Sequence, residues 1–364
     1  MPMKSLDAEK SSAVTTLQLS DQAYEANVQE GYVVAEELLE AKRGILAKFL
    51  HWEAFLDRKM GVEPHGPKRI TPENKKPPNQ WIMFFMWGSV GSYSLVGIST
   101  GFLGWEFGLS LGQSLPIMLL GTLLGSAAAG WCASLGPGTG LRQVAISRYS
   151  FGWWPSKIVA LLNIIEQVGW SAVNCITGGQ ALSAVSGYSL SIVLGIVILS
   201  VVSVILSFGG YTAILNVQRY FWILFFVIVL VIYGEIGGYA DLSAPATVSG
   251  STAAGSVLTV LAIMYGDGSS WCSIISDYYV HYPVETSKTK IFLMTTFGIW
   301  IPINVGLIIG ALIASQMADN DAWATAYSDN GMGGLLLLIL YPLPFAKFML
   351  VFLSLGGSTY PFIM

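Results

Sequence analysis

The chain has 364 residues, of which 53% are hydrophobic and 11% are charged. Soluble domains average about 25% charged residues, so this composition excludes an ordinary soluble domain and indicates a membrane protein. The first 79 residues hold 11 of the 18 Lys and Arg residues and 12 of the 22 Asp and Glu residues. We therefore expect a polar N-terminal segment, residues 1–79, followed by a transmembrane domain, residues 80–364.

The N-terminal segment contains two kinds of sequence. Residues 1–30 show no apolar period and are expected to be disordered. Within residues 33–60, Leu, Ile and Phe recur at helical spacing, with acidic residues early and basic residues late. This pattern predicts an amphipathic helix against the inner membrane surface or the core, and a solvated helix is an equal alternative.

The transmembrane domain contains eight apolar segments, each near the roughly 20 residues that a helix needs to cross a bilayer. These predicted spans 1 to 8 cover roughly residues 81–103, 109–133, 155–185, 188–208, 218–238, 254–280, 290–316 and 333–360.

Basic residues of this domain gather in alternate connections. They lie between spans 2 and 3, 4 and 5, and 6 and 7: Arg142, Arg148, Lys157, Arg219, Lys288 and Lys290. The other connections carry Asp and Glu instead, and Lys347 lies within span 8. Because cytoplasmic loops are enriched in Lys and Arg, the N-terminus is predicted to be cytoplasmic.

Gly and Ser interrupt spans 1 and 6 at their middles, around Gly88–Ser94 and Gly266–Ser270. Such clusters mark either unwound backbone or close helix packing. Interrupted helices at matching positions of two inverted repeats point to a binding site at the bilayer midplane. Small-residue packing is the alternative, and we prefer it for Gly121-x-x-x-Gly125 in span 2. Asp267 favours a functional break in span 6.

Span 3 carries Glu166, Trp170 and Asn174 on one helical stripe. A carboxyl group at membrane depth is costly unless it is paired, protonated or wet, so Glu166 is a functional candidate, with a structural hydrogen bond as the alternative. With Trp271 in span 6, the aromatic rings, amide and carboxylates predict a transporter site for a flat, polar solute. Asp277 is expected to anchor or cap a helix end.

Other kinds of site find no support in the sequence. The three cysteines and three histidines stand apart, so we expect neither a metal site nor a disulfide framework. No nucleophile–base constellation or phosphate-binding loop is visible, so the chain is not expected to be an enzyme, nor to bind nucleic acid.

Four motifs in chain order resemble the nucleobase–cation symporter family, specifically its fungal purine–cytosine permease group. They are Gly61-Val62-Glu63-Pro64 before span 1, Gly136 to Gln143 in the 2–3 loop, Gly169-Trp170 to Asn174 with Gly178-Gly179-Gln180 in span 3, and Asp277-Tyr278-Tyr279-Val280 with Pro283 after span 6.

The resemblance implies an all-α transporter of twelve spans, with a five-plus-five inverted repeat and discontinuous helices 1 and 6. It also implies that Trp170, Asn174 and Trp271 hold a planar base and that Ser89 matches a serine of span 1. Uptake in this family is coupled to protons, for which Glu166 and Asp267 are our candidates.

The chain departs from the family pattern at three places. Gln218 stands where a glutamate is common in span 5, and Ser358 takes the place of a substrate-binding asparagine in span 8. The sequence ends at Met364, so spans 9–12 and the end of the second repeat are expected to be absent. The replacements at Gln218 and Ser358 predict an altered substrate range.

The sequence thus predicts proton-coupled uptake of purines or cytosine across the plasma membrane, with H⁺ as the coupling ion and no organic cofactor. A related heterocycle such as a B6-type vitamin is an alternative cargo. An alternative of another class is a non-transporting sensor, or a truncated remnant that dimerises with or competes against a full-length relative. A homo-oligomer is a further possibility for the chain itself.

Overall fold

The computed structural model describes residues 69–75, 83, 87, 88, 95–207 and 210–359. The side chains of residues 206–222 and 357–359 lie outside this description. Within the described ranges the protein is helical and contains no strand, which confirms the all-α fold class. The predicted amphipathic helix at 33–60 lies outside the described residues.

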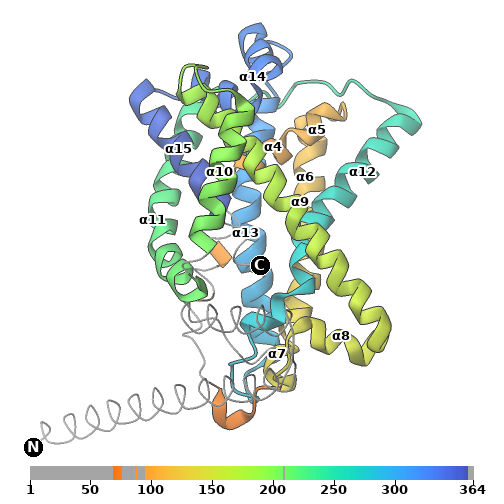
Figure 1. Cartoon of the computed structure of the whole chain (residues 1–364). Helices are drawn as coiled ribbons and strands as arrows, with labels where there is room; N and C mark the ends of the chain where they lie inside the picture. Colours follow the sequence, from red (N-terminus) through yellow and green to blue (C-terminus); the bar gives the residue numbers. More distant parts are fainter. Residues whose placement is uncertain (1–68, 76–82, 84–86, 89–94, 208–209, 360–364) are drawn as a thin grey trace, which may run out of the picture.

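Seven longer helices of the described residues form a bundle (Figure 1). They are α6 (Leu111–Ala133), α9 (Trp153–Val185), α10 (Ile192–Ser207), α11 (Gly210–Ile236), α12 (Gly250–Ser269), α13 (Lys288–Ala314) and α15 (Leu343–Thr359). Shorter or more polar helices are α4 (Leu95–Gly101), α5 (Leu103–Glu106), α7 (Gly136–Thr139), α8 (Gln143–Phe151) and α14 (Asp321–Ile339). Helices α6 with α7, α9 and α13 are long and apolar enough to cross a membrane.

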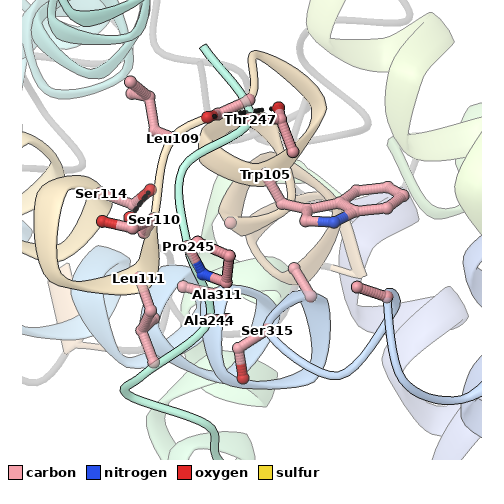
Figure 2. A pocket seen from close by; sticks show the side chains of 14 residues that line it. Trp105, Leu109, Ser110, Leu111, Ser114, Ala244, Pro245, Thr247, Ala311 and Ser315 are labelled. Atoms are coloured by element: carbon pink, nitrogen blue, oxygen red, sulfur yellow. Dashed lines mark hydrogen bonds between the residues drawn. The ribbon is translucent and has the colours of Figure 1, made fainter. Parts of the chain in front are cut away.

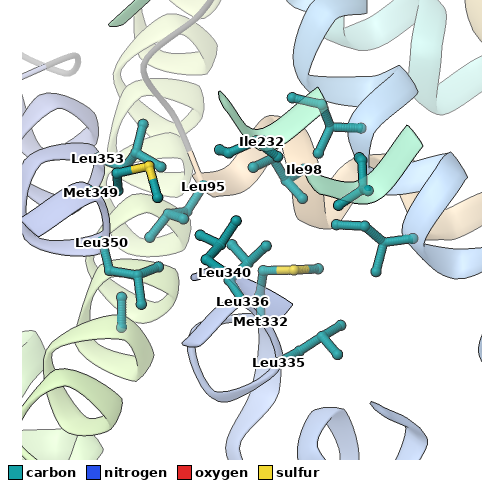
Figure 3. Packing of buried hydrophobic residues seen from close by; sticks show 14 of the residues in the cluster. Leu95, Ile98, Ile232, Met332, Leu335, Leu336, Leu340, Met349, Leu350 and Leu353 are labelled. Atoms are coloured by element: carbon teal, nitrogen blue, oxygen red, sulfur yellow. The ribbon is translucent and has the colours of Figure 1, made fainter. Parts of the chain in front are cut away.

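Helix α13 lies in the middle of the bundle and joins two hydrophobic cores (Figure 1). The first core packs α6, α12 and the turns after α12 against one part of α13. The second packs α4, α11, α14 and α15 against the remainder, around Leu336 and Leu350 (Figure 3). Two thirds of the apolar window of α13 is buried (67%), whereas α9 buries only 11% of its own and presents the rest outward.

Glycines allow two pairs of helices to approach closely. A Cβ on Gly125 of α6 would lie 3.0 Å from the Cα of Gly268 in α12, and Gly121 would meet Met264 at 2.7 Å. This confirms the packing interpretation of Gly121-x-x-x-Gly125. Helices α4 and α13 meet in the same way, because the Cα atoms of Gly97 and Gly101 face Gly306 and Gly310.

The break in span 6 lies later than predicted. Gly266, Asp267 and Gly268 remain α-helical, and the α-helix gives way to 3₁₀ turns η3 (Ser270–Ser273) and η4 (Ile275–Tyr278). A Cβ on Gly268 would lie 2.7 Å from the backbone of α6, so this glycine serves helix contact rather than unwinding. The break predicted in span 1 falls mostly outside the described residues.

Span 8 is also corrected. The predicted segment 333–360 is two helices, α14 and α15, separated at Leu340–Pro342. Pro342 lacks a backbone N–H and disfavours helix in the residue before it, so one helix cannot continue through it. The start of α14 was predicted as a loop. Asn320 caps it, because its side-chain oxygen accepts a hydrogen bond from Trp323 N at 3.1 Å.

The connections meet in two groups at opposite ends of the bundle. We call residues 69–75, 134–157 and 277–290 the basic end: Lys75 Nζ donates to the carbonyls of Pro137 and Tyr282, and Ile70 N donates to Gly140 O at 2.8 Å. Burial lowers the pKa of Lys75, and neighbouring Arg69 adds to this effect. Helices α7 and α8 mark this end in Figure 1.

Residues 102–110, 237–249 and 315–332 form the acidic end, where α14 lies in Figure 1. Thr247 N donates to Gly108 O at 2.9 Å, and Tyr327 OH donates to a carboxylate oxygen of Glu106 at 2.7 Å. Connections predicted to share a membrane side therefore contact one another.

Candidate functional site

Helix α9 supplies one wall of the predicted site. Glu166 and Trp170 are half-buried, whereas Asn174 is buried with 4% of its surface exposed. The Asn174 side-chain nitrogen donates to the Trp170 carbonyl at 2.9 Å, and the Glu166 carboxyl hydrogen-bonds the Trp170 side chain. The three predicted residues therefore form one connected stripe on a single helix.

The second wall is the non-α backbone after α12. Trp271 lies in η3 with 1% of its surface exposed, and its ring meets Trp87 of span 1 edge to face at 4.9 Å. The indole N–H of Trp87 donates to the Tyr279 hydroxyl at 2.8 Å, and that hydroxyl is 2.6 Å from the Thr295 hydroxyl of α13. Spans 1, 6 and 7 therefore hold Trp271 in a closed aromatic cluster.

The two walls contact each other below Trp170, toward the basic end. Ser273 Oγ of η3 donates to Asn163 Oδ1 of α9 at 2.5 Å. Cys272 is near enough to Glu166 to experience its charge, and its thiol hydrogen-bonds Cys132 of α6. The structure thus brings the Glu166 stripe beside the turn that carries Trp271.

The remaining predicted residues differ in position. Asp267 is half-buried in the last turn of α12, one turn before η3. Asp277 accepts a hydrogen bond from Gln143 N, the first residue of α8, at 2.7 Å, which supports its predicted role at a helix end. Ser89 lies outside the described residues. Ser358 lies in the last turn of α15, but its side chain is not described.

A cavity of about 100 Å³ lies at the acidic end, away from this stripe (Figure 2). Trp105, Leu111, Thr247 and Ser315 are among its lining residues, and none of the predicted site residues lines it. Trp271, by contrast, is buried, with its ring against Trp87 and 1% of its surface exposed.

Sequence reasoning missed three contributors. Trp87 and Tyr279 complete the aromatic cluster, and Asn163 joins α9 to η3. Asn163 could have been found from spacing, because it lies seven residues before Trp170 on the same helical face and is a polar residue in an apolar span. In the described ranges, no three His, Cys, Asp or Glu residues gather as metal ligands.

Helices long and apolar enough to cross a bilayer, with their connections in two groups at opposite ends, indicate a polytopic α-helical membrane protein. A family described as "Permease for cytosine/purines, uracil, thiamine, allantoin" matches residues 71–351. The chain belongs to this family. Its matches are transporters, which confirms that it is not an enzyme.

Three relatives illustrate the range of the family. The vitamin B6 transporter TPN1 of Saccharomyces cerevisiae is 33% identical over 313 residues, 83% of this chain and 54% of that protein. The purine-cytosine permease FCY21 of the same yeast is 31% identical over 326 residues, 88% of this chain and 60% of that protein. The purine-cytosine permease fcyB of Emericella nidulans is 30% identical over 308 residues, 83% of this chain and 59% of that protein. The chain thus spans 54 to 60% of the length of these relatives.

Proposed function

We propose that this chain binds a nucleobase, a purine or cytosine, between α9 and η3 and contributes to its proton-coupled uptake. The observation that carries the proposal is the contact of these two elements. It joins Asn163, seven residues before Trp170 on α9, to Ser273, two residues after Trp271. The names of FCY21 and fcyB supply the substrate class.

The chemistry of the stripe suits a planar heterocycle. Indole rings of Trp170 and Trp271 offer stacking faces, and an aromatic pair contributes about 0.5–1.5 kcal/mol beyond the burial of its area. An Asn amide has two donors and an acceptor oxygen with two lone pairs, and the bond from Asn174 to Trp170 O uses one donor. Hydrogen bonds of this kind discriminate strongly, because an analogue without the matching group leaves them unmade.

Two carboxyl groups are proposed to couple transport to H⁺. Glu166 hydrogen-bonds the Trp170 side chain, so a change in its protonation would act on the α9 wall, and its charge reaches Cys272 of η3. Asp267 lies one turn before η3, where helix ends and 3₁₀ backbone begins. Protonation would neutralise either group before the site moves past the apolar core.

Vitamin B6 is the second candidate cargo. It is favoured by the similarity to TPN1, and by the predicted departures at Gln218 and Ser358. A five-plus-five inverted repeat, a cytoplasmic N-terminus and a plasma-membrane location complete the proposal. The alternative to a transporter is a membrane protein that binds the cargo without transporting it.

Binding to the full chain in lipid nanodiscs separates these possibilities. We expect adenine or cytosine to quench tryptophan fluorescence, and the Trp170→Ala or Asn174→Ala variant to raise the Kd about tenfold or more. Trp154→Ala is the matched control, because Trp154 lies on the same helix and is 73% exposed. Binding of pyridoxine alone would favour the second candidate. Unchanged Kd values in both site variants would reject the site.

A further inference from the structure

The Ser273 hydroxyl makes a short hydrogen bond to a side chain of another element, that of Asn163. Ser171 and Ser200 donate to carbonyls of their own helices. The Ser273 hydroxyl has a local acceptor too, Ser270 O at 3.2 Å, yet its shorter bond, 2.5 Å, goes to Asn163 of another element. A hydroxyl carries one hydrogen, so the shorter contact is the main bond.

Turn η3 has little of its own to fix its position. It is a four-residue 3₁₀ segment, and Ile274 beyond it departs from helical geometry with φ −136°. Short 3₁₀ segments have weaker internal hydrogen bonding than α-helices. The placement of η3 therefore depends on its contacts with neighbours, which are Trp87 through Trp271, α6 through Cys272 and α9 through Ser273.

Asn163 has further polar neighbours. Gln167 Nε2 approaches the same amide oxygen at 3.4 Å, and the buried Gln167 Oε1 has no hydrogen-bond partner among the described residues. Asn163 precedes Trp170 by seven residues, which places it about 10 Å nearer the basic end along α9. A cargo leaving the stripe toward that end would meet this polar contact first.

We propose that the Asn163–Ser273 bond is a link that holds η3 against α9 and thereby positions Trp271 for the cargo. The positioning role rests on the proposed function, whereas the link between η3 and α9 does not depend on it. Asn163 and Ser273 are positioning residues. Breaking their bond lets η3 move away from α9, which weakens cargo binding and opens the route toward the basic end.

Cys272, the neighbour of Ser273, reports on the link without any substrate. The full chain in nanodiscs would carry Cys132→Ser, which keeps a hydrogen-bonding group toward Cys272, and Cys175→Ala, so that Cys272 is the one thiol left. We expect Ser273→Ala and Asn163→Leu to raise its alkylation rate by maleimide about fivefold, the effect of losing a typical net hydrogen bond. Ser273→Thr keeps the hydroxyl and should restore slow labelling, and Ser200→Ala is the matched control.

The double variant provides a second test. If the two side chains act through one bond, Asn163→Leu with Ser273→Ala labels no faster than either single variant. Additive effects, or labelling at the unmodified rate in both single variants, would overturn the link. If Asn163→Leu fails to fold, the comparison of Ser273→Ala with Ser273→Thr decides the question, because the first substitution removes only the hydroxyl and the second keeps it.

Cargo binding then tests the positioning role. The Kd for adenine, cytosine or pyridoxine should rise in Ser273→Ala and return in Ser273→Thr. Faster labelling with an unchanged Kd would overturn the positioning role. Faster labelling in a chain that binds none of the three compounds would instead reject the proposed function and leave the link standing.

Discussion

Glu166 is the single side chain on which the proton-coupling proposal can be tested most directly. Its carboxyl group hydrogen-bonds the Trp170 side chain on α9, and Cys272 of η3 lies within range of its charge. Glu166→Gln keeps the shape and removes the charge and the titration. We expect this variant to lose accumulation of labelled base against a gradient while it retains exchange of internal for external base. The measurement is uptake into cells or vesicles at pH 5 and pH 7.

A matched variant tests whether the result is specific to the stripe. Glu235 lies in the last turn of α11, next to the acidic end, and accepts from Tyr341 N at 3.0 Å. Glu235→Gln should leave the pH dependence of accumulation intact. Accumulation by Glu166→Gln that still rises with acidity would remove Glu166 from the coupling role.

Tyr327 is a residue whose contribution depends on alkaline pH. Burial raises its pKa above the usual value near 10, and the hydrogen bond to Glu106 and the charge of that carboxylate raise it further. A raised folded-state pKa means that its stabilising effect is complete below pH 10 and is lost as pH rises beyond it. Tyr327→Phe should therefore flatten the fall of Tm between pH 9 and pH 11. An equal fall in both proteins would contradict this.

The identities of the candidate residues could be predicted from the sequence, but their contacts could not. An amide, a carboxylate and an indole stand out in an apolar span, because polar groups at membrane depth are costly and therefore rare unless they have a function. The ring that packs on Trp271 is Trp87, from a span far away in the sequence. Which of several aromatic residues meets another is decided by helix packing, and no local pattern records it.

Within the helices, a glycine can either mark a break in the helix or allow close packing against another helix, and the sequence alone does not distinguish the two. Gly268 was predicted to unwind span 6, yet it lets α12 contact α6. Unwinding begins at Ser270. Hydropathy located α6, α9, α10 and α13 to within a few residues, because lipid imposes a minimum apolar length. It placed the start of α11 eight residues too late, so Arg219 lies inside this helix and not in the predicted turn. It failed for α14, where a capped polar helix with Gly331 at φ +62° continues into an apolar turn.

The contact of α4 with α13 gives a prediction with an internal control. A Cβ on Gly101 would lie 2.8 Å from the Cα of Gly310 and would overlap the carbonyl of Leu307, whereas a Cβ on Gly97 would lie 3.6 Å from Gly306. Gly101→Ala should therefore lower Tm by several degrees or reduce the folded yield, because backbone cannot move aside. Gly97→Ala should behave like the unmodified protein. Thermal denaturation of both in detergent makes the comparison.

For the whole molecule, the two ends argue for one orientation. Connections that carry Lys and Arg meet at the basic end, and connections with Asp and Glu meet at the acidic end. The structure thus sorts the loops into the same two sets as their charges do. Lys157 lies over the ring of Trp154 at 4.1 Å, near exposed Tyr149 and Trp153, an aromatic and basic arrangement typical of a membrane interface.

Orientation can be measured with single cysteines at exposed positions of each end. In a chain without its three native cysteines, Lys157→Cys marks the basic end and Asp321→Cys marks the acidic end. Because basic loops stay in the cytoplasm, an impermeant maleimide should modify the Asp321 position in intact cells and the Lys157 position only after permeabilisation. Modification of both positions in intact cells would show that they share a side, and the reverse pattern would place the N-terminus outside. Either result would show that the distribution of Lys and Arg does not predict the topology of this chain. Movement of a cargo from the acidic end to the basic end would then no longer correspond to uptake into the cell.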